Sequence, residues 1–176
     1  MSMIFLILVL FMNHAQVNFA RESCSLKKRE KKEIIRIFGD DTSTEAIQIP
    51  DDLASSLESL GNGDCIHRVK REGKVLGYLL STSAKGRFDV FDYSVIFSDD
   101  LSVLGVMVTT YRSTHGFGIC QKRWLNQFKG YNGGELELGR DIDAVTGATF
   151  SASSMVKDIQ RCLHLLTTLK EEKLFE

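Results

Sequence analysis

Residues 151–173 read SASSMVKDIQRCLHLLTTLKEEK, and this stretch has the clearest structural pattern in the chain. Its apolar side chains recur at i, i+4 and i+7 spacing, which places them on one face of an α-helix. They are Met155, Ile159, Cys162, Leu163, Leu166 and Leu169. Ser151 or Ser153 is expected to cap this helix, because a serine oxygen can accept a hydrogen bond from a free backbone N–H. The pattern predicts a long C-terminal helix, running to Lys173, whose apolar face packs on a core.

The region before this helix is predicted to form a β-sheet. Four runs rich in β-branched and aromatic residues occur as two pairs, and each pair flanks a short turn. The runs are Cys65–Lys70 with Lys74–Ser81, and Phe88–Ser98 with Leu101–Tyr111. Strands joined by tight turns pair antiparallel. The order of elements therefore predicts the α+β class: an antiparallel sheet with packed helices and a long C-terminal helix.

Shorter elements are expected on either side of the sheet. Lys28–Phe38 has the spacing of an amphipathic helix that ends at Gly39. Gln121–Phe128 is predicted to be a second short helix. Asp40–Asp64 is polar and irregular, which leaves room for one short helix over Asp52–Leu60.

The composition favours one globular domain over residues 21–176. The chain has 176 residues, of which 43% are hydrophobic, and a net charge of −1. This charge balance gives no electrostatic footprint for nucleic acid. The four cysteines have no spacing typical of haem c, zinc or iron–sulfur sites, so no metal is expected. They are Cys24, Cys65, Cys120 and Cys162. Their spacing does not assign disulfides, although Cys162 on the apolar stripe is predicted to be a buried free thiol.

The first twenty residues differ from the rest of the chain. Met1–Ala20 contains no charged side chain, whereas the following residues hold all 45. Ile4–Phe11 is an unbroken apolar run, which is typical of a signal peptide and shorter than the roughly 20 residues that span a bilayer. We therefore expect export to the periplasmic or cell-surface side of a bacterial membrane. Whether this N-terminus is cleaved or retained as an anchor is left open.

The segment before the C-terminal helix, DAVTGATFS at Asp143–Ser151, carries the chemistry. Gly147 and Ala148 are small, so the backbone beside Thr149 is expected to be open to a large reaction partner. The Thr149 hydroxyl is predicted to lie just before a helix N-terminus, where free N–H groups and the helix dipole favour an anion such as phosphate. The alternative is that this segment is only a turn followed by a serine or threonine cap.

This segment resembles the flavinylation motif of FMN-binding domains, D-x-x-(S/T)-G-A-T-x-(S/T), and matches all six specified positions. The family includes the C subunit of the sodium-translocating NADH:quinone oxidoreductase and the G subunit of the Rnf complex. The resemblance implies that a flavin transferase joins FMN through its phosphate to Thr149, using FAD and releasing AMP. Asp143 takes the acidic position that the transferase recognises. The other matching positions are Thr146, Gly147, Ala148 and Ser151.

The resemblance extends over about Cys65–Leu166. A glycine-containing loop, Tyr111–Gly118, precedes a short helix that ends near Gln127-Phe128-Lys129-Gly130, as in the family. The larger complexes often have H-x-E-T-P-G-x-G in this loop, whereas this chain lacks the glutamate and the proline. The resemblance implies a second group of residues near the flavin ring, namely His115, Gly116, Gly118 and Trp124. The alternatives are that His115 faces solvent and that Trp124 belongs to the core.

Together these observations predict an extracytoplasmic electron-transfer protein with covalent FMN, more an electron carrier than a stand-alone enzyme. No catalytic residues are assigned. The expected partners are the flavin transferase and a membrane or extracytoplasmic redox protein. Two alternatives stay open: a flavin-dependent reductase with its own small substrate, and a non-redox secreted binding module.

Overall fold

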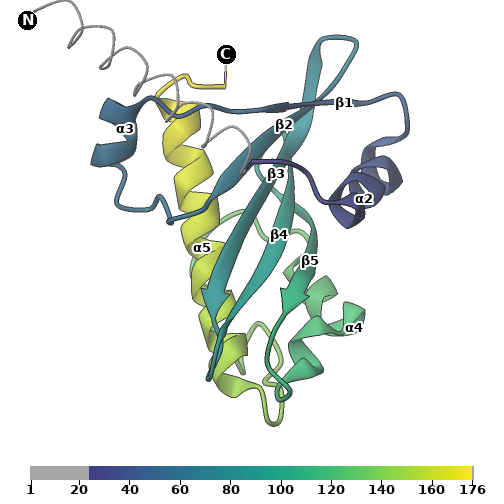
Figure 1. The fold of residues 1–176 in the computed structure, drawn as a ribbon, viewed down its shortest axis with the longest axis vertical. Coiled ribbons are helices and arrows are strands. Elements are labelled where there is room, and N and C mark those ends of the chain that lie inside the picture. The colour runs from purple at the N-terminus through teal and green to yellow at the C-terminus, as the bar shows by residue number, and fades with distance from the viewer. Residues whose placement is uncertain (1–23, 176) are drawn as a thin grey trace, which may run out of the picture.

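The protein is described by a computed structural model that covers residues 24–175, so the predicted signal segment at 1–20 lies outside it. Its centre is a five-stranded antiparallel sheet in the order β1-β2-β3-β4-β5 (Figure 1). The strands are β1 (Ser43–Ala46), β2 (Cys65–Arg71), β3 (Lys74–Lys85), β4 (Val90–Ser98) and β5 (Val103–Tyr111). Each strand pairs with its neighbour in sequence, because every connection allows the chain to fold back beside itself. The α+β prediction is confirmed.

Helices lie on both faces of this sheet. The long helix α5 (Thr149–Glu171) covers one face, and α2 (Lys28–Phe38) packs on the other (Figure 1). The short helices are α3 (Asp51–Ser56) and α4 (Lys122–Leu125), and α4 is flanked by 3-10 turns at Phe117–Cys120 and Asn126–Phe128. Over the described residues 24–175, none of the helices has the length and apolarity needed to span a membrane.

The limits of α2 agree with the sequence prediction, including its end at Gly39, which has a φ of 97°. Three local predictions are wrong. The strand β1 was not expected, because Ser43–Ala46 is a mostly exposed edge strand without apolar alternation. Phe88 does not begin a strand but lies in the turn between β3 and β4, since β3 continues to Lys85. The third concerns the start of α5.

The helix α5 begins at Thr149 and has Ala148 as its N-cap, so neither Ser151 nor Ser153 caps it. Gly147 has a φ of 76°, a left-handed conformation that reverses the chain and lets the helix start directly after Ala148. Ser151 is consequently inside the first turn and is buried.

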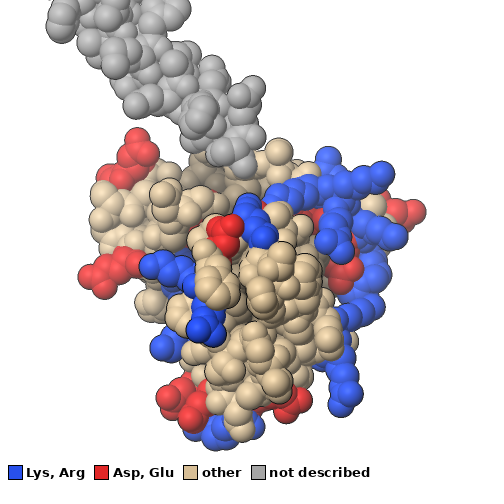
Figure 2. All heavy atoms as spheres, turned by 60° about the horizontal axis from the view of Figure 1, so that its bottom comes forward, with Lys and Arg blue, Asp and Glu red and all other residues tan. Residues whose placement is uncertain are grey.

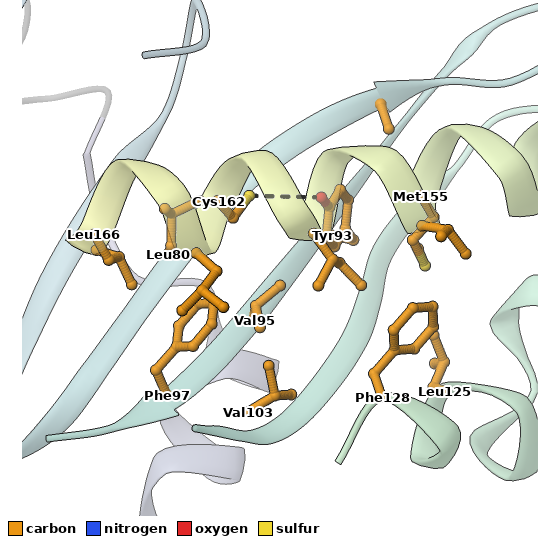
Figure 3. Close-up of a cluster of buried hydrophobic side chains, with 14 of the residues drawn as sticks. Leu80, Tyr93, Val95, Phe97, Val103, Leu125, Phe128, Met155, Cys162 and Leu166 are labelled. Atoms are coloured by element: carbon orange, nitrogen blue, oxygen red, sulfur yellow. Dashed lines mark hydrogen bonds between the residues drawn. The ribbon is translucent and has the colours of Figure 1, made fainter. Parts of the chain in front are cut away.

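The main core lies between α5 and the sheet (Figure 3). All six residues of the predicted apolar stripe are buried. In Figure 3, Met155, Cys162 and Leu166 point from α5 toward side chains of β3, β4 and β5. Cys162 is a free thiol, as predicted, and its sulfur lies 3.7 Å from the Tyr93 hydroxyl. Burial raises the pKa of the Cys162 thiol, so the side chain acts as a small hydrophobic group.

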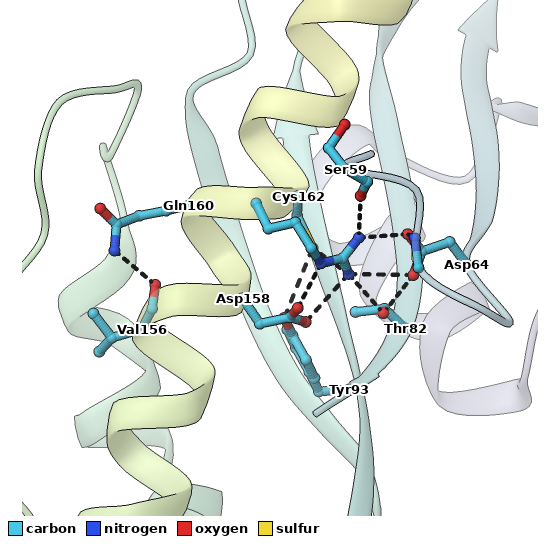
Figure 4. Close-up of polar contacts among 10 residues, drawn as sticks. Ser59, Asp64, Thr82, Tyr93, Val156, Asp158, Gln160 and Cys162 are labelled. Carbon is cyan, nitrogen blue, oxygen red and sulfur yellow. Dashed lines mark hydrogen bonds and ion pairs between the residues drawn. The ribbon is translucent and has the colours of Figure 1, made fainter. Parts of the chain in front are cut away.

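A polar network fixes the middle of α5 to the sheet and to the loop before β2 (Figure 4). The Arg161 guanidinium donates to Asp158 at 2.6 Å, to Asp64 at 2.7 Å and to the Thr82 hydroxyl at 3.0 Å. Burial by itself would lower the pKa of Arg161, but its hydrogen bonds to the two carboxylates raise it above the usual value. The Arg161 guanidinium therefore stays charged, and its hydrogen-bond donors have acceptors within the protein.

The opposite face of the sheet is smaller and contains one buried acid. Glu30 of α2 is 1% exposed and accepts hydrogen bonds from the hydroxyls of Ser81 (2.8 Å) and Ser94 (2.5 Å). A disulfide joins Cys24 to Cys65, the first residue of β2. The residues before α2 are thereby attached covalently to the sheet, a pairing that the cysteine spacing alone did not assign.

Candidate cofactor site

Three segments meet at one end of the molecule: the β3–β4 turn, the loop after β5 and the start of α5 (Figure 1). They enclose a pocket of about 430 Å³. Its lining contains no aspartate or glutamate and consists of Arg87, Phe88, Tyr111, Ser113, His115, Gly116, Gly147, Ala148, Thr149, Phe150 and Ser151. In Figure 2 this end is turned forward, and the centre of the face shown has few charged side chains.

Thr149 is the first residue of α5 and is exposed. A Cβ atom placed on Gly147 would have no neighbour within 4 Å, so the space beside the threonine is open. The open backbone that was predicted beside Thr149 is therefore present in the structure. Accessibility and a small upstream neighbour are what an external enzyme would need to reach this oxygen.

The N-terminus of α5 also offers hydrogen-bond donors. The first intrahelical bond at this end runs from the Ala152 N–H to the Ala148 carbonyl at 2.9 Å, which leaves the N–H groups of Thr149, Phe150 and Ser151 outside the helical ladder. No side chain in the described part of the chain caps this end. Free N–H groups and the positive end of the helix dipole favour an anion here. The alternative that this segment is merely a serine or threonine cap is not what the structure shows.

The predicted loop after β5 packs against the motif segment. A Cβ on Gly116 (φ +82°) would lie 2.6 Å from the Tyr111 hydroxyl and 3.4 Å from the Cβ of Ala148. A Cβ on Gly118 would collide with the Val145 side chain. The Tyr111 hydroxyl donates to the His115 carbonyl at 2.8 Å and so closes the loop. Glycines at these two positions allow the loop to lie close to Val145 and Ala148 of the motif.

Not all predicted site residues line this pocket. Asp143, Thr146, Gly118 and Trp124 border a separate, shallower hollow of about 240 Å³. Trp124 is 5% exposed, and its Nε1 donates to the Asp143 carbonyl at 2.8 Å. Trp124 thus belongs to the core, which was the alternative to a contact with the flavin ring. Its hydrogen bond holds the backbone of the motif at Asp143. The Asp143 side chain remains exposed, where a protein partner can contact it.

Sequence reasoning did not identify Arg87, Phe88 and Phe150 as pocket residues. Arg87 and Phe88 lie at the tip of a hairpin that the sequence placed partly in a strand. Phe150 occupies an unspecified position of the motif, so the motif gives it no role. The signal that could have identified them was a phenylalanine directly after Gly86-Arg87 and another directly after Thr149.

Two larger hollows lack motif residues. One, of about 500 Å³, lies between α2, β5 and α4, and the other, of about 700 Å³, lies beside α3 and Cys65. In residues 24–175, the potential metal ligands that cluster are Cys24, Cys65 and His67. Both sulfurs of this trio are joined in the disulfide, so they are not thiolate ligands. Burial lowers the pKa of His67, which favours its neutral form.

Comparison with known proteins found one family model that includes the motif. The sequence model of the family described as "FMN-binding domain" matches residues 89–164, a range that holds β4, β5, the glycine loop and the whole motif. The match confirms, over residues 89–164, the resemblance that the motif indicates.

Among solved structures, the chain is similar to NqrC of Shewanella oneidensis, with 14% sequence identity and a TM-score of 0.49. The match covers 77% of this chain and 82% of that chain. None of the proteins with curated descriptions matches the sequence.

Proposed function

We propose that this protein is an extracytoplasmic electron-transfer flavoprotein in which FMN is bound through a phosphoester to Thr149. The observation that carries this proposal is the combination of an exposed Thr149 with an uncapped helix N-terminus at the edge of an acid-free pocket. The match to the FMN-binding domain family encloses this motif and supports FMN as the ligand.

The residues of the pocket fit this cofactor. The free N–H groups at the start of α5 would hold the phosphate, and the open backbone at Gly147 leaves room for the chain that leads to the ring. The Tyr111–Gly118 loop, with His115 and Gly116, would contact the ring from the side of β5. The bound flavin would supply one- and two-electron chemistry, while the protein sets its orientation and electrostatics.

Attachment would proceed by attack of the Thr149 hydroxyl oxygen on the FMN phosphorus of FAD. A threonine–phosphate bond forms, the pyrophosphate bond of FAD breaks, AMP leaves and the hydroxyl proton is released. A flavin transferase would carry out this step, and the exposed Asp143 carboxylate is the group it would recognise. Trp124 and Gln127 support this role by holding the Asp143 backbone through hydrogen bonds of 2.8 and 2.9 Å.

Two features support an extracytoplasmic location. Met1–Ala20 has the composition of an export signal, and Cys24 and Cys65 form a disulfide, which persists in oxidising compartments. A covalent bond suits such a location, because free FMN would be lost by dilution. The redox partner would be a membrane or extracytoplasmic protein.

The proposal is tested by producing the protein with and without a flavin transferase and measuring its intact mass. We expect an increase equal to FMN minus one water only with the transferase. The electron-transfer role predicts that the modified protein is reduced and reoxidised reversibly by mediators. Steady turnover of a small substrate by the isolated protein would instead indicate a reductase.

A further inference from the structure

The tip of the β3–β4 hairpin, residues 86–89, supplies part of the pocket wall that neither the motif nor the glycine loop provides. The Gly86 N–H donates to the Asp89 carbonyl at 2.7 Å and closes this tip. A Cβ on Gly86 would lie 2.6 Å from the same carbonyl oxygen, so the tight turn needs glycine. The turn thereby holds Arg87 and Phe88 at the pocket.

Apolar rings are left open to solvent at this site. Phe88 is 71% exposed and Phe150 is 55% exposed, and both line the pocket. The Phe88 ring also lies beside His115 of the glycine loop, with ring centroids 6.1 Å apart. Exposed apolar rings that line one concave site are typical of a binding site for a planar ligand that covers them.

Arg87 brings an unpaired positive charge to the same wall. Its guanidinium lies 5.4 Å from the centroid of the Phe88 ring. Arg87 belongs to none of the ion pairs formed among residues 24–175, and the pocket lining contains no carboxylate. Its charge is therefore available to a ligand.

We propose that Phe88 packs on the isoalloxazine ring and that Arg87 raises the reduction potential of the flavin. This inference rests on the proposed function and extends it to a segment, 86–89, outside the motif. The start of α5 already serves the phosphate, so the ring is the part of FMN left to contact the hairpin tip. Reduction of FMN by two electrons and one proton leaves a negative charge on the ring, which a nearby guanidinium stabilises.

Arg87→Gln tests the electrostatic part. At a fixed ambient potential, we expect the variant to shift the ratio of oxidised to reduced flavin by about three- to tenfold toward the oxidised form. High salt should shrink the difference from the parent, because it screens an exposed charge. The matched control is Lys85→Gln, which removes a cation two residues away that lines a different hollow, beside Asp158 and Arg161.

Phe88→Ala tests the packing part through the fluorescence anisotropy of the attached flavin, which falls when the ring is free to move. We expect lower anisotropy in this variant. Ile35→Ala is the control, since Ile35 is also exposed, at 49%, but lines the hollow beside α2. Equal anisotropy of Phe88→Ala and the parent would overturn the packing role of Phe88.

The outcomes separate this inference from the proposed function. Intact mass reports attachment in each protein. If FMN is attached and Arg87→Gln has the potential of the parent, the inference is overturned while the covalent site stands. If no protein is modified, the proposed attachment fails, and the affinity for added FMN becomes the test. Arg87→Gln should then bind reduced FMN about three- to tenfold more weakly than the parent and Lys85→Gln, and equal affinities for reduced FMN would overturn the role of Arg87.

Discussion

The start of α5 differs from the rest of the helix. Along the rest, apolar side chains are buried and polar groups have partners, whereas at the start they do not. From Met155 to Leu169 the helix has a buried apolar face, and Arg161 joins it to Asp64 and to Thr82 of β3. At its start the same helix has no side-chain cap, and Thr149 and Phe150 are both exposed. Unsatisfied donors and exposed rings are unfavourable in a free protein. Their concentration at one end indicates that this end is built for a ligand and the remainder for rigidity.

This comparison predicts that stability and flavin attachment can be altered separately. The largest effect on stability is expected for Leu166→Ala in the buried half of the helix, because the substitution leaves a cavity in the core. The free energy of unfolding should fall by about 3 kcal/mol, as measured by urea denaturation. FMN attachment at a temperature where the variant is folded should equal that of the parent. His164→Ala, an exposed change on the same helix, is the control and should leave stability unchanged. Loss of attachment in folded Leu166→Ala would contradict the separation.

Asp64→Asn should have the next largest effect. This carboxylate is fully buried and accepts from Arg161, from the Thr82 hydroxyl at 2.5 Å and from the Gly61 N–H at 2.8 Å. Removing its charge leaves a half-buried guanidinium with one carboxylate partner, and we expect a loss of about 2 kcal/mol. The double variant with Arg161→Met should recover part of that loss. If the two losses simply add, the two residues are not coupled.

Gly147→Val concerns the open end of the helix. The added side chain meets no neighbour, but the φ of 76° is unfavourable for a β-branched residue, so stability should fall by about 1–2 kcal/mol. Attachment should be nearly abolished, because the new side chain crowds the approach to Thr149. Gly134→Val offers a comparison, since Gly134 also has a positive φ, of 83°, and open surroundings. Normal modification of folded Gly147→Val would show that access does not limit the reaction.

The smallest effect is expected for Asp92→Asn at the base of the glycine loop. Asp92 of β4 forms an ion pair with Arg112, which follows β5, at 2.8 Å. The hydrogen bond from Arg112 lowers the pKa of Asp92, so the ion pair stabilises the protein above the unfolded pKa of aspartate and is lost as pH falls through the lower, folded value. Stability at pH 7 should drop by about 0.5–1 kcal/mol in the variant. The difference in the free energy of unfolding between the parent and Asp92→Asn should vanish in acid. A difference that stays constant down to low pH would contradict the role of this ion pair.

The parts of this fold that follow periodic patterns were predictable. Leu166 and its neighbours repeat at helical spacing, and the hairpin strands are bounded by turn residues, so the class and most elements followed from the sequence. The motif and the glycine loop were predicted to lie at one site, and residues of both line the pocket. Each of these features is local in the chain.

What the sequence did not reveal depends on contacts between distant segments. Ser43–Ala46 becomes a strand because β2 offers it an edge, and Cys24 pairs with Cys65 because the fold brings them together. Arg87 and Phe88 reach the pocket through the length of β3, which no local pattern encodes. The start of α5 was misplaced because serine is a frequent cap, whereas here Gly147 sets the start of the helix.

The central claim is that the Thr149 oxygen carries the flavin. It is tested most directly by the intact mass of the parent and of Thr149→Val, both produced with a flavin transferase, with Thr146→Val as the matched control. We predict a mass increase of one FMN minus one water in the parent and in Thr146→Val, and the unmodified mass in folded Thr149→Val. A flavin adduct on Thr149→Val, or an unmodified parent, would contradict the account.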